Sequence, residues 1–258
     1  MIKRALALIL ISICLLLLIT RESTGQTDKE IVVSAAISLS DAFQEIGKNF
    51  KTKHKNGRIL FNFGGSGALA RQIIGGAPVD VFASASPKDM DDLDKVNMIL
   101  KDTRIDFAGN QIVLVVPVNA AFPLTSFHDL ARAEIKRMAI GNPKTVAAGR
   151  YAEEVLEHFK LREALKAKLI FAENVRQVLD YVARGEVDAG LLYSTDAAIK
   201  ADRVKIAMEA PEQGHKPVVY PIAVIKGSKK EIWGRKFISF VVSQEGNQIM
   251  KKYGFKSF

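Results

Sequence analysis

The chain has 258 residues, of which 48% are hydrophobic and 25% charged, and its formal net charge at pH 7 is +9. This composition excludes a collagen-like or largely disordered chain, and the length allows one large domain or two small ones. Because the lysines and arginines are spread along the chain among acidic residues, the charge does not by itself indicate a nucleic-acid-binding protein.

The first 25 residues have the pattern of an export signal. A basic start precedes an uninterrupted apolar run over residues 5–19, which is within the range of a secretory signal and short for a membrane span. Small residues at Ser23 and Gly25 stand three and one before a plausible cleavage site. We therefore expect a cleaved signal peptide over 1–25 and a periplasmic mature protein beginning at Gln26. An uncleaved anchor would keep the same domain tethered outside.

The only cysteine, Cys14, lies midway through the apolar run, whereas a lipid-attachment cysteine is expected at its end. The mature chain would then contain neither a disulfide nor a thiol nucleophile. Its stability must come from its core, and about 230 residues are enough for that.

The remaining sequence alternates strand-like and helix-like segments. Short apolar runs predict strands, and segments with apolar residues three and four positions apart predict helices. In chain order we expect a strand at 31–36, helix 38–54, strand 58–63, helix 68–76, strand 79–86, helix 87–96, strand 111–118, strand 137–141, helix 148–160, strand 169–173, helix 174–186, strands 187–193, 204–208 and 218–226, and helices within 231–255. This alternation predicts parallel sheets covered by helices.

Five strand ends carry small or neutral polar residues, and the first four of them open a predicted helix. In parallel sheets, ligands bind beyond the carboxyl ends of the strands. A helix start exposes unpaired N–H donors and the positive end of the helix dipole, so several starts aimed at one point make an anion site. Each junction alone is explained as an ordinary helix cap, and only the set favours an anion site. The junctions are 35–41, 64–67, 145–151, 173–176 and 191–197.

The glycine turn at 64–67, Gly-Gly-Ser-Gly, does not match a nucleotide-binding loop. A Walker loop has lysine and then serine or threonine after its last glycine, and Ala68 and Leu69 stand there. A Rossmann fingerprint needs a third glycine, which is missing.

The five junctions together resemble the periplasmic molybdate-binding proteins of ABC transporters. The pieces that carry the resemblance are AAISLSDAF, GSGALARQI, GAPVDVFASAS, GNPKTVAAGRYAEEVL, ENVRQVLDYVARGEVDAGLLYSTDA, YPIAV and KKYGF, spread over nearly the whole mature chain. The resemblance implies an α/β, two-lobed periplasmic binding protein fold (type II), with mixed, mostly parallel sheets and the ligand cleft between the lobes. The first lobe would hold 26–109 and 218–258 and the second 110–217, with crossings near 109–110 and 217–220.

The resemblance also implies a set of ligand contacts. Ser38 and Ser66 would contact the ligand from one lobe through hydroxyl and backbone N–H groups. Ala148 and Val175 would contribute backbone N–H groups from the other lobe, and Tyr193 its hydroxyl. The ligand would be molybdate or tungstate, bound as an oxyanion with no direct protein ligand to the metal. No cofactor and no catalytic residue are implied.

A site of this kind offers mainly hydrogen-bond donors, so it fits a fully deprotonated tetrahedral dianion, which presents only acceptors. Hydrogen phosphate carries a proton that backbone N–H groups cannot accept. Serine and tyrosine oxygens could accept it, so this filter is partial. Sulfate matches in charge but is smaller than molybdate or tungstate.

Two positions depart from the family pattern. Asn174 stands where aspartate is usual, but it can still cap its helix. Ala147 stands where proline is usual, and Arg150 follows the next glycine, where we expect it near the cleft mouth and favouring anion access. Asp80 and Asp196 resemble family positions with structural roles, at a strand start and a helix cap.

We therefore expect an exported, monomeric solute-binding protein that delivers molybdate or tungstate to an ABC permease and binds no nucleic acid. Alternatives are a binding protein for sulfate or another oxyanion, a sensor domain that signals to a receptor, and an exported hydrolase with Ser66 as nucleophile. The hydrolase would need a histidine near Ser66. The four histidines lie on none of the junctions and at no metal-ligand spacing; they are His54, His128, His158 and His215.

Overall fold

The computed structural model describes residues 29–55 and 57–257. The predicted signal peptide, its cleavage site and Cys14 lie outside these residues, so they stay predictions. None of the helices in the described ranges combines the length and apolarity that a membrane crossing requires.

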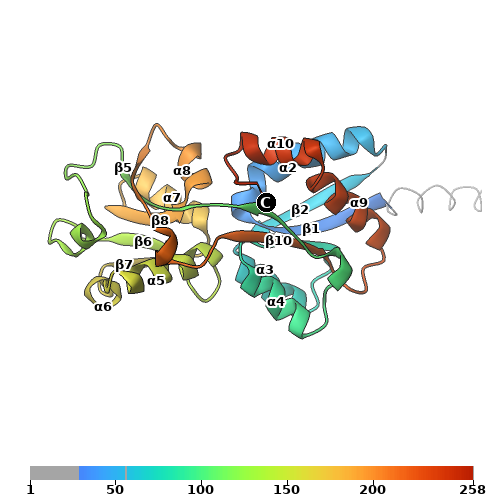
Figure 1. Cartoon of the computed structure of the whole chain (residues 1–258), viewed down its shortest axis with the longest axis horizontal. Coiled ribbons are helices and arrows are strands. Elements are labelled where there is room, and N and C mark those ends of the chain that lie inside the picture. Colours follow the sequence, from blue (N-terminus) through green and yellow to red (C-terminus); the bar gives the residue numbers. More distant parts are fainter. Residues whose placement is uncertain (1–28, 56, 258) are drawn as a thin grey trace, which may run out of the picture.

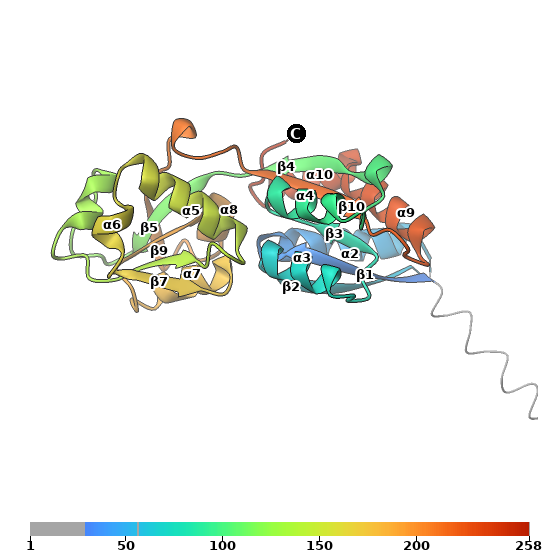
Figure 2. The same ribbon diagram turned by 90° about the horizontal axis from the view of Figure 1, so that it is seen from below.

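The first sheet has the strand order β2-β1-β3-β10-β4. Its strands are β1 (Glu30–Ala36), β2 (Arg58–Gly64), β3 (Val81–Ala83), β4 (Ile105–Gly109) and β10 (Val219–Val224). On one face lie α2 (Ser40–Lys53), α9 (Glu231–Val241) and α10 (Gln244–Lys252), and on the other α3 (Ser66–Ile74) and α4 (Pro87–Lys95) (Figures 1 and 2). Short 3-10 turns at Ile37–Leu39 and Lys101–Thr103 complete this lobe.

The second sheet has the order β7-β6-β8-β5-β9. Its strands are β5 (Ile112–Pro117), β6 (Met138–Gly141), β7 (Leu169–Ala172), β8 (Ala189–Tyr193) and β9 (Val204–Glu209). Its helices are α5 (Ala147–His158), α6 (Arg162–Leu165), α7 (Val175–Ala183) and α8 (Ser194–Ile199), with 3-10 turns at Phe127–Ala131 and Glu212–Gly214.

The two sheets form two lobes that lie side by side (Figure 1). The chain leaves the first sheet after β4, enters the second at β5 and returns from β9 to β10. The two-lobed α/β fold with mixed sheets is thereby confirmed. Among the described strands, however, parallel and antiparallel neighbours are equally frequent, because the strands next to the crossings, β5 and β10, run against their neighbours.

Of the strands and α-helices in the described part of the chain, three were not expected from the sequence: β4, α8 and the four-residue α6. Strand β4 was not expected, because its first two residues, Ile105 and Asp106, are exposed and only its last three are buried, so no apolar run or alternation marks it. Helix α8 follows the fifth junction, so all five junctions open a helix or helical turn. It has six residues, too few to show a helical period.

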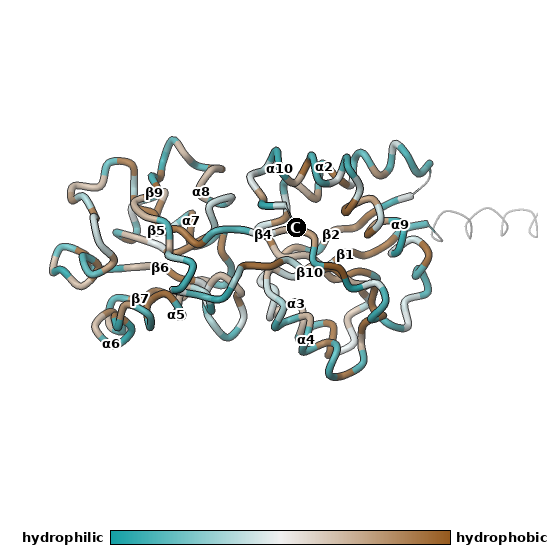
Figure 3. The backbone as a smooth tube through the Cα atoms, viewed as in Figure 1, coloured by the Kyte–Doolittle hydropathy of each residue, from teal (hydrophilic) through white to brown (hydrophobic). Residues whose placement is uncertain are grey.

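Each lobe has its core between the sheet and its helices. Hydrophobic residues, coloured brown in Figure 3, run along the inner strands β5 and β10. In the first lobe, Phe43 of α2 packs edge-on against Phe237 of α9, with ring centroids 5.8 Å apart, an arrangement that aromatic rings favour. The Asp80 carboxylate accepts hydrogen bonds from Val32 N–H and the Ser228 hydroxyl at the start of β3, which agrees with a structural role.

Candidate functional site

A small cavity lies where the lobes meet. All five residues expected to contact the ligand line it: Ser38, Ser66, Ala148, Val175 and Tyr193. The other lining residues are Ala36, Ile37, Gly64, Gly65, Ala85, Val146 and Ala147. A larger groove beside it shares Ser38 and is otherwise lined by residues of α2, α7, α8 and the C-terminal segment. The chemistry described below belongs to the smaller cavity, because three helices start there.

Those three helices, α3, α5 and α7, begin at Ser66, Ala147 and Val175. The first N–H groups of a helix have no partner within it, and neither α3 nor α5 has a side-chain cap. Asn174 caps α7 by accepting from Gln177 N–H at 3.0 Å, as expected. After β2 the small residues Gly65 and Ser66 lead directly into α3, whereas residues 142–146 separate β6 from α5 and residues 173–174 separate β7 from α7.

The first turns of these three helices contain no acidic residue. By contrast, α2, α4, α8, α9 and α10 each carry an aspartate or glutamate in the first turn, where a carboxylate is favourable to the helix dipole. At the cavity that stabilising negative charge is missing. An anion bound there would supply it without meeting a carboxylate at these helix starts.

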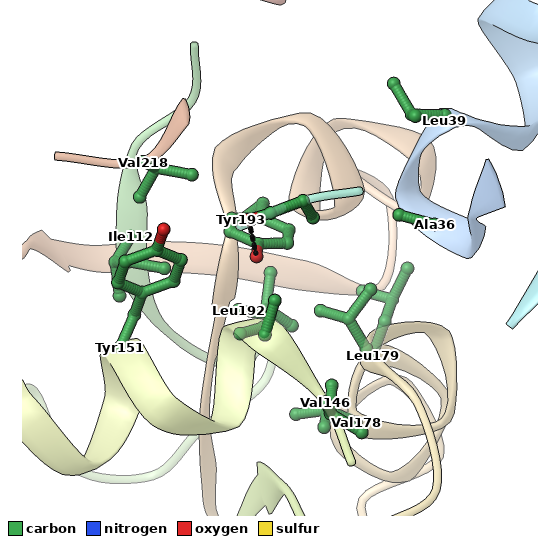
Figure 4. Close-up of a cluster of buried hydrophobic side chains, with 14 of the residues drawn as sticks. Ala36, Leu39, Ile112, Val146, Tyr151, Val178, Leu179, Leu192, Tyr193 and Val218 are labelled. Carbon is green, nitrogen blue, oxygen red and sulfur yellow. Dashed lines mark hydrogen bonds between the residues drawn. The ribbon is translucent and has the colours of Figure 1, made fainter. Parts of the chain in front are cut away.

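Three hydroxyls complete the lining. Ser66 Oγ accepts a hydrogen bond from Ala85 N–H at 3.0 Å, and Ser38 Oγ lies 3.1 Å from the Tyr220 hydroxyl. The Tyr193 hydroxyl donates to the Ala85 carbonyl oxygen across the lobe boundary, at the long distance of 3.4 Å. Burial raises the pKa of Tyr193 well above its ordinary value, so it remains a donor. Figure 4 shows Tyr193 above Leu192 of its own lobe, with Ala36 of the first lobe to its right.

Contacts between the lobes hold the cavity closed. The Ala68 N–H donates to the Thr145 carbonyl at 3.2 Å, and the Arg71 guanidinium donates to the Lys144 carbonyl at 2.9 Å. Arg176 of α7 also reaches Asp41 of α2 at 2.7 Å. The structure is therefore a closed form, in which both lobes reach the same cavity.

Arg150 does not stand free at the cleft mouth as expected. Its guanidinium forms an ion pair across the lobes with Asp89 of α4, at 2.5 Å. The Asp89 side chain is 3% exposed, and this burial raises its pKa although Arg150 opposes the shift. The charge of Arg150 is therefore paired with Asp89 in the contact between the lobes and is not presented to an incoming anion.

Asp196 also differs from its expected role as a helix cap. It lies in the first turn of α8 without capping it, and its buried carboxylate pairs with Arg176 at 2.5 Å. Arg176 thereby joins Asp196 of its own lobe to Asp41 of the other. Sequence reasoning missed this link, as it missed the roles of Ala85 and Tyr220, because these residues contact one another only through the fold.

The geometry disfavours the hydrolase alternative. The described residues that line the cavity include no histidine, and the Ser66 oxygen accepts from a backbone N–H and has no neighbouring base among its hydrogen-bond partners. A serine nucleophile requires a base within hydrogen-bond reach.

Comparison with known proteins agrees with the fold and the arrangement of this cavity. The family model of bacterial extracellular solute-binding proteins matches residues 31–256. A putative ABC transporter substrate-binding lipoprotein, YvgL of Bacillus subtilis, is 39% identical over 92% of this chain and 90% of its own. The molybdate-binding protein ModA of Escherichia coli is 37% identical over 88% of each chain.

A solved structure of a related protein has the same fold. The substrate-binding domain of a putative molybdenum ABC transporter from Clostridium difficile superimposes with a TM-score of 0.68 at 36% identity, covering 89% of this chain and 99% of that one. The chain therefore belongs to the bacterial extracellular solute-binding proteins, and within them to the ModA-like proteins.

Proposed function

We propose that this protein is exported, captures molybdate or tungstate between its lobes and delivers the anion to the permease of an ABC importer. The observation that carries the proposal is the meeting of three helix starts, none with an acidic first turn, at one cavity shared by both lobes. The names of the Escherichia coli relative and of the Clostridium difficile structure point to molybdate or molybdenum as the cargo.

The site would hold the anion by hydrogen bonds alone. The donors are the hydroxyl and backbone N–H groups of Ser38 and Ser66 and the backbone N–H groups of Ala148 and Val175. The Tyr193 hydroxyl would turn from its long contact with the Ala85 carbonyl to the anion. A hydrogen bond to an ionised acceptor contributes about 1.5–3 kcal/mol, so several together give tight binding without a fixed positive charge. The anion is cargo rather than a cofactor, and its metal atom touches no side chain.

Lobe closure would follow from the same contacts. We place the lobe boundaries at Asn110 and Pro217, so that 26–109 and 218–258 move against 110–217. An anion that touches both lobes shifts the population toward the closed form. The closed protein, acting as a monomer, is the form that a permease would recognise.

Calorimetric titration with molybdate, tungstate, sulfate and phosphate, after removal of bound anion, tests this proposal. We expect tight binding of the first two and weak binding of the others. Tight binding of sulfate alone would assign a different cargo. No heat with any of the four would mean that the helix starts are ordinary caps.

Replacing Ser38 or Ser66 with alanine should each weaken molybdate binding by about 10- to 150-fold, because each change removes one hydrogen bond to an ionised acceptor. The exposed Ser239 on α9 provides a matched control, and Ser239→Ala should bind as the native protein does. Unchanged affinity in both cavity variants would remove the proposed site.

Replacing Arg150 with methionine should weaken molybdate binding by about 10- to 100-fold, because closure would then bury Asp89 without its cation. The double variant with Asp89→Asn should regain most of the lost affinity, since the carboxylate that needs a partner is gone. If titration shows no such recovery, the ion pair does not support closure.

A further inference from the structure

A chain of buried hydrogen bonds links Ser38 to both crossings between the lobes. Ser38 Oγ lies 3.1 Å from Tyr220 Oη, and the side-chain amide of Asn110 donates to Tyr220 Oη at 3.2 Å and to Thr195 Oγ1 at 2.9 Å. Tyr220 belongs to β10, and Asn110 stands between β4 and β5. All four side chains are at most 6% exposed.

The orientation of the Asn110 amide determines which group donates in each of these hydrogen bonds. The Gln111 backbone N–H, which can only donate, lies 2.9 Å from one amide atom of Asn110, so that atom is the carbonyl oxygen. The hydroxyl of Ser194 donates to the same oxygen at 3.1 Å. The NH₂ group of Asn110 therefore faces Tyr220, and Tyr220 Oη is an acceptor for it.

The hydroxyl of Tyr220 then needs an acceptor for its own hydrogen. Burial raises the pKa of its hydroxyl, so the proton is retained. Of the two hydrogen-bond partners that Tyr220 Oη has in the described part of the chain, the Asn110 NH₂ cannot accept. The proton consequently goes to Ser38 Oγ, and the hydrogen of Ser38 is left to point at the cavity that Ser38 lines.

The hydroxyl of Ser66 is also held with its hydrogen toward the cavity, in this case by a backbone N–H group. The Ala85 backbone N–H donates to Ser66 Oγ at 3.0 Å, so the hydroxyl hydrogen of Ser66 is also free for the cavity. Both serines thus present hydrogen atoms to the space in which an anion would sit.

We propose that Asn110 and Tyr220 are positioning residues that hold Ser38 as a donor toward the cavity and thereby restrict the site to fully deprotonated tetrahedral oxyanions. This inference rests on the proposed function. Ser38 Oγ keeps one lone pair after accepting from Tyr220, but it can turn that lone pair to the proton of hydrogen phosphate only by turning its own hydrogen away from the anion. Among the described residues, the partner in reach of that hydrogen is Tyr220 Oη. The Tyr220 hydrogen would then be buried without an acceptor, which is unfavourable.

The test compares two anions of equal charge and similar size. At pH 8, sulfate carries no proton and hydrogen phosphate carries one, so the ratio of their affinities measures the cost of that proton. Both are titrated as competitors of bound molybdate. Tyr220→Phe keeps the ring and removes the hydroxyl that donates to Ser38. We expect the phosphate-to-sulfate affinity ratio to rise about tenfold, because Ser38 becomes free to accept.

The control is Tyr253→Phe, which removes a hydroxyl bonded to Glu45 outside the cavity and should leave the ratio unchanged.

A second variant should turn Ser38 from a donor toward the cavity into an acceptor. Asn110→Asp replaces the donor by an acceptor for the Tyr220 proton, so Ser38 would donate to Tyr220 and present only its oxygen to the cavity. Its molybdate affinity should fall about tenfold further than that of Tyr220→Phe.

The outcomes separate the two proposals. If the native protein binds no molybdate, the proposed function fails. If it binds molybdate but Tyr220→Phe leaves the ratio within about twofold of native, or phosphate still does not compete, the positioning role fails while the function stands.

Discussion

Replacing Gly65 with alanine should weaken molybdate binding by about a hundredfold, equivalent to the loss of one or two charge-assisted hydrogen bonds, while the free energy of unfolding changes little. Gly65 has φ −68° and ψ 131°, a conformation open to any residue. An added Cβ would nevertheless lie 2.8 Å from the Thr145 carbonyl oxygen and 3.2 Å from that of Glu173. Both belong to the other lobe and are backbone atoms, so the clash arises only when the lobes close.

Gly75→Ala provides the control, because Gly75 lies at the other end of α3 with φ −75° and its added Cβ would meet nothing closer than 3.4 Å. Titration with molybdate and urea denaturation should be measured on both variants. Native affinity in Gly65→Ala would show that the site does not need this close approach of the lobes. A large loss of stability would show that the glycine serves its own lobe instead.

Replacing Arg176 with methionine should lower the free energy of unfolding by about 3–5 kcal/mol at pH 8, the usual cost of removing one partner of a buried ion pair. The Asp196 side chain is fully buried, and its Oδ2 atom has no hydrogen-bond partner in the described part of the chain. Without Arg176 the carboxylate would be left charged and unpaired. Asp41→Asn is the control, because Asp41 is 43% exposed and its pair with Arg176 should contribute only about 1 kcal/mol.

The loss in Arg176→Met should depend on pH. Burial raises the pKa of Asp196 to about 6 in the folded protein, even with Arg176 opposing the shift, whereas an unfolded aspartate titrates near about 3.9. The folded state therefore binds the extra proton between these values, and stability falls as the pH rises through this window. Without Arg176 the folded pKa is higher still, so the variant should be least impaired at pH 5 and most impaired at pH 8. Equal losses in urea denaturation at both pH values would contradict this account.

The local parts of the site could be predicted from the sequence. Small or neutral polar residues after the ends of strands predict helix starts with unpaired N–H groups. The resemblance to molybdate-binding proteins implied the particular contacts, and the structure brings these residues to one cavity: Ser38, Ser66, Ala148, Val175 and Tyr193. The short strand β4 and the six-residue α8 were missed, because elements so short show no periodic pattern.

The sequence by itself determined the alternation of strands and helices, the helix starts and the absence of acidic residues in three of their first turns, since each depends on neighbours within a few positions. Only the tertiary structure decided that Arg150 pairs with Asp89, 61 positions away, and that Tyr220 meets Ser38 across 182. It also brought Gly65 against the Thr145 carbonyl. Such contacts leave no periodic mark in the sequence, because they arise where two lobes, each folded around its own core, come together.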